Sequence, residues 1–326
     1  MAAETPRAFE HVLSFALEHP WALTRPMLAI VAGIIGRHVA GQHASEAEIS
    51  AALVNRKNLP QPVPGGAVAL IRISGVIAPR MNLLSDISGG VTFEGLSAQL
   101  QVAMANKAVK TIVLDIDSPG GSVAGMTEFA REVMAARTKK TVVAQIQYLG
   151  ASAAYGVASA ATEILAAPSA MVGSVGVYGA HDDITEALAK LGVKRTYISA
   201  GKGKTDAIDG PLSDEAKGRM QAVIDDAYGR MVGDIVKGRG QGMTAARVRN
   251  EWQAHLYPAT EALALGMIDG IATLDDTLAR VTGGAHPVKT SALSTTTDDT
   301  TQEPATATVQ DRSADAQRVA LALLEL

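Results

Sequence analysis

The alternation of strand-like and helix-like stretches between residues 65 and 282 constrains the fold most strongly. Short runs of β-branched and aliphatic residues predict strands, and the longer stretches between them predict helices. The expected strands are 67–73, 111–116, 141–146, 172–177 and 195–198, and the expected helices are 96–105, 126–136, 151–161 and 214–237. Strands that alternate with helices build βαβ units with parallel strand pairs. The sequence therefore predicts an α/β fold with a mostly parallel sheet.

The regions on either side of this domain have a different character. Residues 1–64 include an apolar run at Met27–Ile35 and end in the Pro-rich stretch Leu59–Pro64, which predicts a helical N-terminal extension followed by a linker. Because the apolar run is shorter than the roughly 18–20 residues that span a bilayer, no membrane span is expected. Residues 283–326 are dominated by Thr, Ala, Asp and Ser, so we expect a disordered tail with a short apolar helix at Val319–Leu324.

Composition excludes several classes of function. Lys and Arg number 29 against 33 Asp and Glu, and the resulting net charge of −4 argues against a nucleic-acid binder that relies on counterion release. The absence of cysteine removes disulfides, a cysteine nucleophile and a thiolate zinc site together. The seven histidines show no metal-ligand spacing. We therefore expect no metal and no nucleic-acid partner, in a chain compatible with the cytoplasm.

Ser152 is the first candidate for a catalytic residue. It follows the expected strand 141–146 and stands at the start of a helix rich in small residues. At a strand-to-helix turn, a serine lies at the edge of the sheet, where the helix N-terminus favours developing negative charge. The spacing approaches the G-x-S-x-G nucleophile elbow, with Ala154 in place of the final glycine. The alternative is a helix N-cap, a position that serine commonly occupies.

Two further segments could carry chemistry, and each has a structural alternative. Ser118–Gly121 directly follows the expected strand 111–116, and its adjacent glycines could present backbone amides to an oxyanion or simply form a turn before a helix. Lys202 and Lys204 alternate with glycines. A lysine acts as a base only when burial or nearby positive charge lowers its pKa, so the alternative is a solvated loop.

Taken together, these motifs resemble the peptidase S49 family. The resemblance rests on the order of four elements: Ser118–Gly121, Ser152 in its small-residue helix, the segment Gly173–Val177 and the loop around Lys204. It covers residues 66–282. The family includes signal peptide peptidases of the A type and phage head-maturation proteases. It implies a fold of repeated ββα units shared with Clp protease and the crotonases.

The resemblance also implies a role for each matching residue. Ser152 is expected to be the nucleophile, and Lys204 the general base that takes its proton. Ser174 is expected to orient the base. The oxyanion hole and the substrate-binding backbone are expected at Gly120, Gly121 and Ala153. Lys202 is the rival for the base. A Ser-Lys dyad of this kind forms an acyl-enzyme and needs no cofactor.

The function expected from the resemblance is a serine endopeptidase that acts on polypeptides. The start of the chain, around Trp21, is similar to the leader of prophage head proteases, and the tail occupies the place of a scaffolding region. A homo-oligomeric capsid assembly or head-maturation protease is therefore expected, acting in the host cytoplasm or the procapsid with capsid and scaffold proteins as partners. The alternatives are a housekeeping signal peptide peptidase, a non-catalytic assembly or scaffolding factor, and a crotonase-type acyl-CoA enzyme.

Overall fold

The computed structural model describes residues 21–23, 61–62, 66–80, 90–206, 210–240 and 242–283. The predicted N-terminal helix at Met27–Ile35 and the predicted disordered tail lie outside these residues, so both stay predictions. Within 1–64, two short strands are described, Trp21–Leu23 and Gln61–Pro62. None of the described helices is long and apolar enough to cross a membrane.

The larger of two sheets is mostly parallel. Its strands are β2 (Gln61–Pro62), β3 (Val68–Ser74), β6 (Thr111–Ser118), β8 (Thr141–Ala151), β9 (Glu163–Ala166), β10 (Met171–Gly173), β11 (Leu256–Pro258) and β12 (Gly270–Ile271). They are ordered β11–β10–β8–β6–β3–β2, with β9 paired to β8 and β12 to β9. Among these pairs, β2–β3 and β10–β11 are antiparallel and the others parallel. The predicted α/β fold with a mostly parallel sheet is confirmed.

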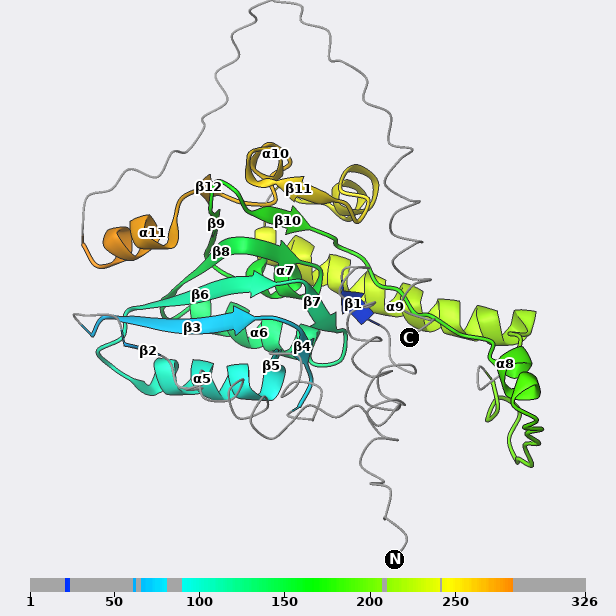
Figure 1. Cartoon of the computed structure of the whole chain (residues 1–326). Helices are drawn as coiled ribbons and strands as arrows, with labels where there is room; N and C mark the ends of the chain where they lie inside the picture. The colour runs from blue at the N-terminus through cyan, green and yellow to red at the C-terminus, as the bar shows by residue number, and fades with distance from the viewer. Residues whose placement is uncertain are drawn as a thin grey trace, which may run out of the picture. The chain divides into compact units, whose positions relative to one another are not determined.

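A second, smaller sheet crosses the end of the first. It contains β1 (Trp21–Leu23), β4 (Ile77–Ala78), β5 (Val91–Thr92) and β7 (Gly120–Ser122) in the order β1–β7–β4–β5. Each of two successive units places one strand in the large sheet and the next in the small sheet before its helix: β3–β4 with α5 (Phe93–Ala105), and β6–β7 with α6 (Met126–Arg137). Figure 1 shows this repeat, which follows the expected ββα pattern.

The remaining helices complete the domain. They are α7 (Ala153–Ala158), α8 (Thr185–Lys190), α9 (Asp214–Arg239), the π-helix η1 (Arg247–Glu251), α10 (Ala259–Ala264) and α11 (Leu274–Val281). Side chains cap several of them as the sequence would favour. Ser213 Oγ accepts the Ala216 N–H at 3.1 Å at the start of α9, and Thr273 and Asp276 form a capping box on α11.

The large sheet is buried on both faces, because its strands alternate apolar side chains between two clusters. Ile71, Ile73 and Leu114 face the main core, which also contains residues of α5, α6, α7 and α9. Val68 and Leu70 belong to a smaller cluster on which α11 packs. Successive side chains of a strand point to opposite faces, so continuous apolar runs such as β3 fit a sheet covered on both sides.

Four predicted elements differ from the observed ones. Strand β8 continues to Ala151, so helix α7 covers only 153–158 of the predicted 151–161. Strand β10 ends at Gly173, because Ser174 adopts a φ of 52°, which an extended strand cannot contain. The predicted strand 195–198 is wrong: these residues are exposed and form no ladder. An apolar stretch forms a strand only where a neighbouring strand pairs with it, and residues 195–198 pair with none of the described strands.

Candidate active site

Ser152 lies at the junction of β8 and α7, and its backbone has an unusual conformation. Its φ is 53° and its ψ −118°, outside the regions that residues other than glycine commonly adopt. Backbone strain of this kind persists only where the surrounding structure enforces it, and it concentrates at functional sites. The junction is thus a sharp strand-to-helix turn, the geometry that presents a nucleophilic serine in other hydrolases.

The hydrogen bonds of Ser152 differ from those of a simple helix cap. Ser152 occupies the N-cap position of α7, but its side chain accepts no hydrogen bond from that helix. Instead Oγ donates to the carbonyl of Gly176 at 3.3 Å, and the backbone N–H donates to the carbonyl of Gly173 at 2.7 Å. The side chain is almost fully buried, at 1% exposure. The hydroxyl is therefore held beside the segment that follows β10.

A bulge in β8 sets the position of this turn. Ile116 of β6 lies opposite Ile146, but Ser118 lies opposite Gly150, so β8 contains extra residues between the two pairs. Bulges of this kind bend a strand and redirect the residues that follow. The redirected end of β8 leads directly into Ser152.

Two carboxylates of β6 contact the bulge. Asp115 hydrogen-bonds the side chain of Gln147, and Asp117 accepts a backbone N–H from Leu149. Burial raises the pKa of Asp115, although Gln147 and the nearby Arg72 oppose that rise. Burial likewise raises the pKa of Asp117 against the effect of the Leu149 hydrogen bond. The contacts of these two carboxylates stabilise the bulge, although their burial costs desolvation free energy.

The glycines of the second motif form strand β7 instead of a plain turn. Gly120 has a φ of 103°, a conformation that favours glycine. A Cβ atom on Gly121 would lie 1.9 Å from the Ile77 carbonyl oxygen, so no side chain fits there. Ser118 supports this approach: its Oγ donates to the Gly75 carbonyl at 2.6 Å and accepts the Gly120 N–H at 3.1 Å. Strand β7 also packs against α7, which begins immediately after Ser152.

Ser174 lies close to Ser152 through the pairing of β8 with β10. Ala151 is opposite Gly173 in that ladder. Gly173 has a φ of 133°, and a Cβ atom there would lie 2.2 Å from the His255 carbonyl oxygen. The Ser174 N–H donates to that same oxygen at 2.7 Å. The structure thus brings Ser152 and Ser174 to one end of the sheet, beside the helix that Ala153 begins.

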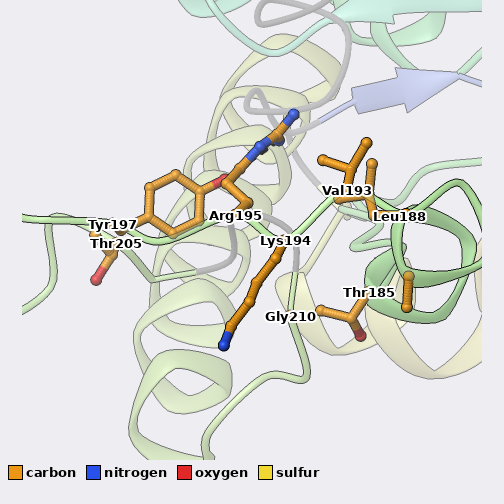
Figure 2. Close-up of a pocket in the computed structure, with 10 residues that line it drawn as sticks. Thr185, Leu188, Val193, Lys194, Arg195, Tyr197, Thr205 and Gly210 are labelled. Carbon is orange, nitrogen blue, oxygen red and sulfur yellow. Dashed lines mark hydrogen bonds between the residues drawn. The ribbon is translucent and has the colours of Figure 1, made fainter.

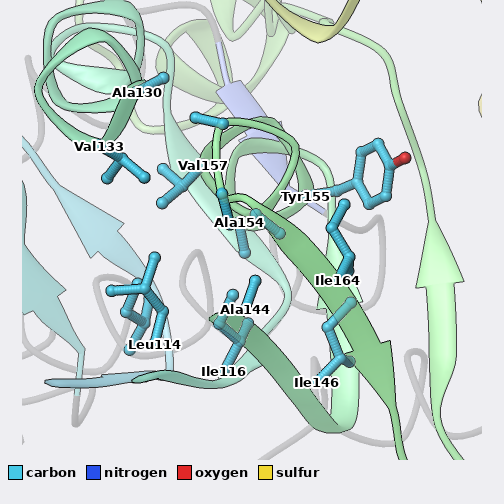
Figure 3. Close-up of a cluster of buried hydrophobic side chains, with 14 of the residues drawn as sticks. Leu114, Ile116, Ala130, Val133, Ala144, Ile146, Ala154, Tyr155, Val157 and Ile164 are labelled. Atoms are coloured by element: carbon cyan, nitrogen blue, oxygen red, sulfur yellow. The ribbon is translucent and has the colours of Figure 1, made fainter. Parts of the chain in front are cut away.

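Helix α7 is buried on every side, which explains its small residues. All of residues 150–160 are buried. Figure 3 shows Ala154 and Val157 among side chains of β6, β8 and α6. A Cβ atom on Gly156 would lie 2.9 Å from the Met126 sulfur. The hydroxyl of Tyr155 donates to the Met267 carbonyl at 2.8 Å, and burial raises the pKa of this phenol above its ordinary range. The segment behind Ser152 is consequently rigid.

Lys204 is placed very differently. It lies in an exposed turn at 202–206, where its N–H donates to the Gly201 carbonyl at 3.1 Å. Within the residues that the structure describes, no hydrogen bond or ion pair engages the Lys204 ammonium, and none joins it to Ser152. The rival Lys202 forms a surface ion pair with Glu215 at 3.1 Å. The structure therefore does not bring the predicted base to the predicted nucleophile within one chain.

An ion pair ties the Lys204 turn to helix α9. The Arg219 Nε donates to the Asp206 carboxylate at 2.7 Å, and a second guanidinium nitrogen contacts the same oxygen. Two donors of one guanidinium on the same oxygen fix the orientation of the pair as well as its charge. Neither this role of Arg219 nor that of Ser118 was predicted. Ser118 was within the recognised motif, whereas no local pattern relates Arg219 to Asp206.

A cavity of about 670 Å³ lies in the same exposed part of the chain. Figure 2 shows its lining around α8, with Lys194, Arg195 and Tyr197 on one segment and Thr185 and Leu188 on the helix. Thr205, next to Lys204, also lines it. It contains none of the predicted catalytic residues, so the Ser152 turn and not this cavity is the candidate active site. Among the described residues, no cluster of metal-ligating side chains is found.

Comparisons with known proteins point to one family of peptidases. Residues 134–286 match the model of peptidase family S49. Protease 4 of Salmonella typhi is 29% identical over 217 residues, which cover 66% of this chain and 34% of that protein. Capsid assembly protease C of Escherichia phage lambda is 29% identical over 294 residues, which cover 85% of this chain and 66% of that protein. Head-tail preconnector protein GP5 of Enterobacteria phage P21 is 29% identical over 229 residues, which cover 68% and 45%.

The alignments thus span from 34% to 66% of the lengths of these three relatives. The matched family region contains Ser152, Ser174 and Lys204, while Gly120 and Gly121 precede it. The resemblance inferred from short motifs is confirmed, and with it the Clp protease/crotonase-like α/β fold. Over residues 134–286, just under half of its length, the chain is thus similar to peptidase family S49.

Proposed function

We propose that this protein is a serine endopeptidase in which Ser152 is the nucleophile. The observation that carries the proposal is the strained turn at Ser152, whose hydroxyl does not cap the helix that follows. A structural serine at an N-cap would adopt an extended conformation and bond the helix amides. The S49 match and the names of the three relatives, two of which are called proteases, support the same reaction.

The proposed mechanism uses Lys204 as the general base. Its neutral amine takes the proton of the Ser152 hydroxyl as Oγ attacks a peptide carbonyl carbon. The backbone N–H groups of Gly121 and Ala153 stabilise the oxyanion, and Ser174 orients the amine. The resulting ammonium protonates the departing amine, which leaves an ester on Ser152. Water, deprotonated by the same lysine, then hydrolyses the ester.

A serine-directed covalent probe tests the nucleophile. The unmodified chain should be labelled at Ser152, and Ser152→Ala should abolish labelling. Ser159→Ala is the matched control, because Ser159 is equally buried but donates to the Gly156 carbonyl at 2.7 Å within α7. Labelling that persists in Ser152→Ala, or that disappears in Ser159→Ala with the fold intact, would contradict the assignment.

We further propose that Lys204 reaches the nucleophile of a neighbouring copy in a homo-oligomer. None of the described residues from 176 to 206 is buried, and this segment exposes large apolar side chains. Among them Leu191 is 77% exposed and Ile198 99%. Several large apolar side chains left exposed along one segment favour a protein interface there. Assembly would both cover these side chains and desolvate the lysine, which lowers the pKa of an amine.

Complementation tests the shared dyad. Ser152→Ala and Lys204→Ala should each be inactive, and a mixture of the two should regain roughly a quarter of the normal activity if every site draws on two copies at random. The mixture must be made under conditions that allow subunits to exchange. A mixture that remains inactive, although mass analysis shows mixed oligomers, would place both residues of the dyad in one chain.

The proposed biological substrate is a capsid or scaffold protein during phage head assembly. The capsid assembly protease of phage lambda matches 85% of this chain, more than the 66% matched by Protease 4. Incubation with purified phage capsid and scaffold proteins should yield discrete cleavage products, whereas Ser152→Ala should yield none. Cleavage of isolated signal peptides with no cleavage of these assembly proteins would instead favour a signal peptide peptidase.

A further inference from the structure

Strand β7 pairs with a segment from a distant part of the sequence. One side of β7 pairs with β4, and the other pairs with β1, the three residues Trp21–Leu23. The β1 pairing is antiparallel and aligns Trp21 with Ser122, Ala22 with Gly121 and Leu23 with Gly120. Figure 1 shows β1, in blue, beside β7.

Without β1, this side of β7 would be a sheet edge. The order of the small sheet is β1–β7–β4–β5, so β1 alone covers that side of β7 within the described residues. An uncovered edge presents unpaired N–H and C=O groups, which accept an additional extended strand. Recognition of extended peptides by addition to a sheet edge is a common binding mode, since the ladder bonds depend little on sequence.

The position of this edge gives it a functional meaning, which rests on the proposed function. Gly121 of β7 supplies one of the two N–H groups proposed for the oxyanion hole, and β7 packs against the helix that follows Ser152. A polypeptide paired with β7 would therefore run beside the nucleophile. The three residues Trp21–Leu23 already occupy that line.

We propose that Trp21–Leu23 are a built-in occupant of the substrate-binding edge of β7, and that extended polypeptide substrates bind only after displacing them. The occupant holds the site closed while the chain is isolated. A three-residue ladder is short, so an incoming polypeptide that pairs over a longer stretch of β7 and its surroundings displaces it. The tether gives the occupant a high effective concentration, which weakens the apparent affinity of every competitor.

Cross-linking tests the occupancy directly, because the chain has no cysteine of its own. Directly opposed residues of an antiparallel pair share a face of the sheet, and their Cα atoms lie within the range that a disulfide spans. The Trp21→Cys/Ser122→Cys variant should form a disulfide under mild oxidation. The matched control Leu23→Cys/Ser122→Cys is displaced by two residues in the register and should cross-link at least about tenfold more slowly.

Peptide binding tests the competition. The probe is a fluorescent peptide with the sequence of residues 17–27, and every variant also carries Ser152→Ala so that no turnover interferes. The cross-linked protein should bind this probe at least about tenfold more weakly than the same protein after reduction, since a locked occupant removes the competent state. The cross-linked control, if any forms, is compared at equal concentration.

A second pair of variants opens the edge without a cross-link. In Ala22→Pro/Leu23→Pro, two adjacent backbone N–H groups are lost, so at least one donor directed at β7 disappears. The probe should bind this variant more tightly than the unmodified chain, by about tenfold. Ala22→Val/Leu23→Val keeps both donors and should bind like the unmodified chain. Thermal unfolding of each variant shows whether the domain is intact.

The outcomes separate this inference from the proposed function. If the disulfide forms and blocks probe binding, the occupant is established even when the reduced protein with Ser152 intact shows no serine reactivity, a result that would refute the catalytic proposal alone. If no disulfide forms, or the cross-linked protein binds the probe as well as the reduced one, the inference is overturned whether or not the protein is a peptidase.

Discussion

The two residues of the proposed dyad lie in regions built in opposite ways. Ser152 belongs to a segment, residues 150–160, in which every side chain is buried. Lys204 belongs to residues 176–206, in which none of the described side chains is buried. The first region packs against both sheets and against α6 and α9 of the same chain. The second is joined to α9 by the Arg219–Asp206 and Lys202–Glu215 ion pairs.

This difference indicates how each residue acquires its geometry. Burial of apolar surface stabilises a conformation by about 25 cal/mol per Å², enough to enforce an unfavourable backbone such as that of Ser152. A segment with no buried residue has no comparable source of stability. Ser152 is therefore positioned by folding alone, and we infer that Lys204, the proposed base, is positioned by assembly or substrate binding.

The largest expected effect concerns the choice of base. Lys204→Ala should lower kcat/KM for a peptide substrate by about 10³-fold or more, because without the amine nothing takes the Ser152 proton. Lys202→Ala is the matched control, since Lys202 is two residues away and pairs with Glu215 at the surface. Its activity should stay within about threefold of normal. The reverse pattern would make Lys202 the base.

Substitution of one isoleucine in each region compares how much the two regions contribute to the free energy of unfolding. Ile146 is fully buried beside the β8 bulge, and Ile198 is 99% exposed. Ile146→Ala should reduce the free energy of unfolding by about 2–5 kcal/mol, because it leaves a cavity in the core. Ile198→Ala should change it by less than about 0.5 kcal/mol in the isolated chain. Denaturant unfolding provides both values, and a large loss in Ile198→Ala would mean that its segment is packed.

The Arg219–Asp206 ion pair, which ties the Lys204 turn to α9, should affect activity more than stability. Arg219→Ala frees Asp206, and we expect activity to fall by about tenfold as the turn loses its orientation, equivalent to about 1.4 kcal/mol. Arg230→Ala removes a comparable ion pair to Asp226 on the same helix and should leave activity unchanged. Steady-state kinetics and thermal melts of both variants separate the effects. Equal activities would show that the turn does not depend on Arg219.

The smallest expected effect is a pH dependence at the bulge. Because burial raises the pKa of Asp115 in the folded protein, the folded state binds more protons than the unfolded state just above pH 3.8. This contribution to stability therefore falls as pH rises through the folded-state pKa and is regained on acidification. At neutral pH, the free energy of unfolding of Asp115→Asn should equal that of the unmodified chain or exceed it by less than about 1 kcal/mol. This difference in free energy should become smaller as the pH is lowered. A difference that widens toward acid would reverse the sign.

Much of the central domain could be predicted from local patterns. The helices at 126–136 and 214–237 were expected within two residues of α6 and α9, and the runs at 67–73 and 111–116 coincide with β3 and β6. These elements are long, strongly periodic or capped, and their burial follows from their own composition. Residues 195–198 show the limit, because their apolar character led to a strand that no neighbour pairs with.

The sequence by itself determined the α/β class, the four motifs and, through their order, the resemblance to family S49. Only the tertiary structure decided how those motifs meet. The bulge of β8, the separate strand β7 and the partner strand Trp21–Leu23 depend on contacts between residues far apart in the chain, which no local pattern encodes. The motif containing Lys204 was recognisable as a sequence, and a solvated loop was one of its two interpretations, but only the structure decided for the exposed position. Local sequence specifies which backbone conformations are favourable, and packing selects the one that brings distant groups together.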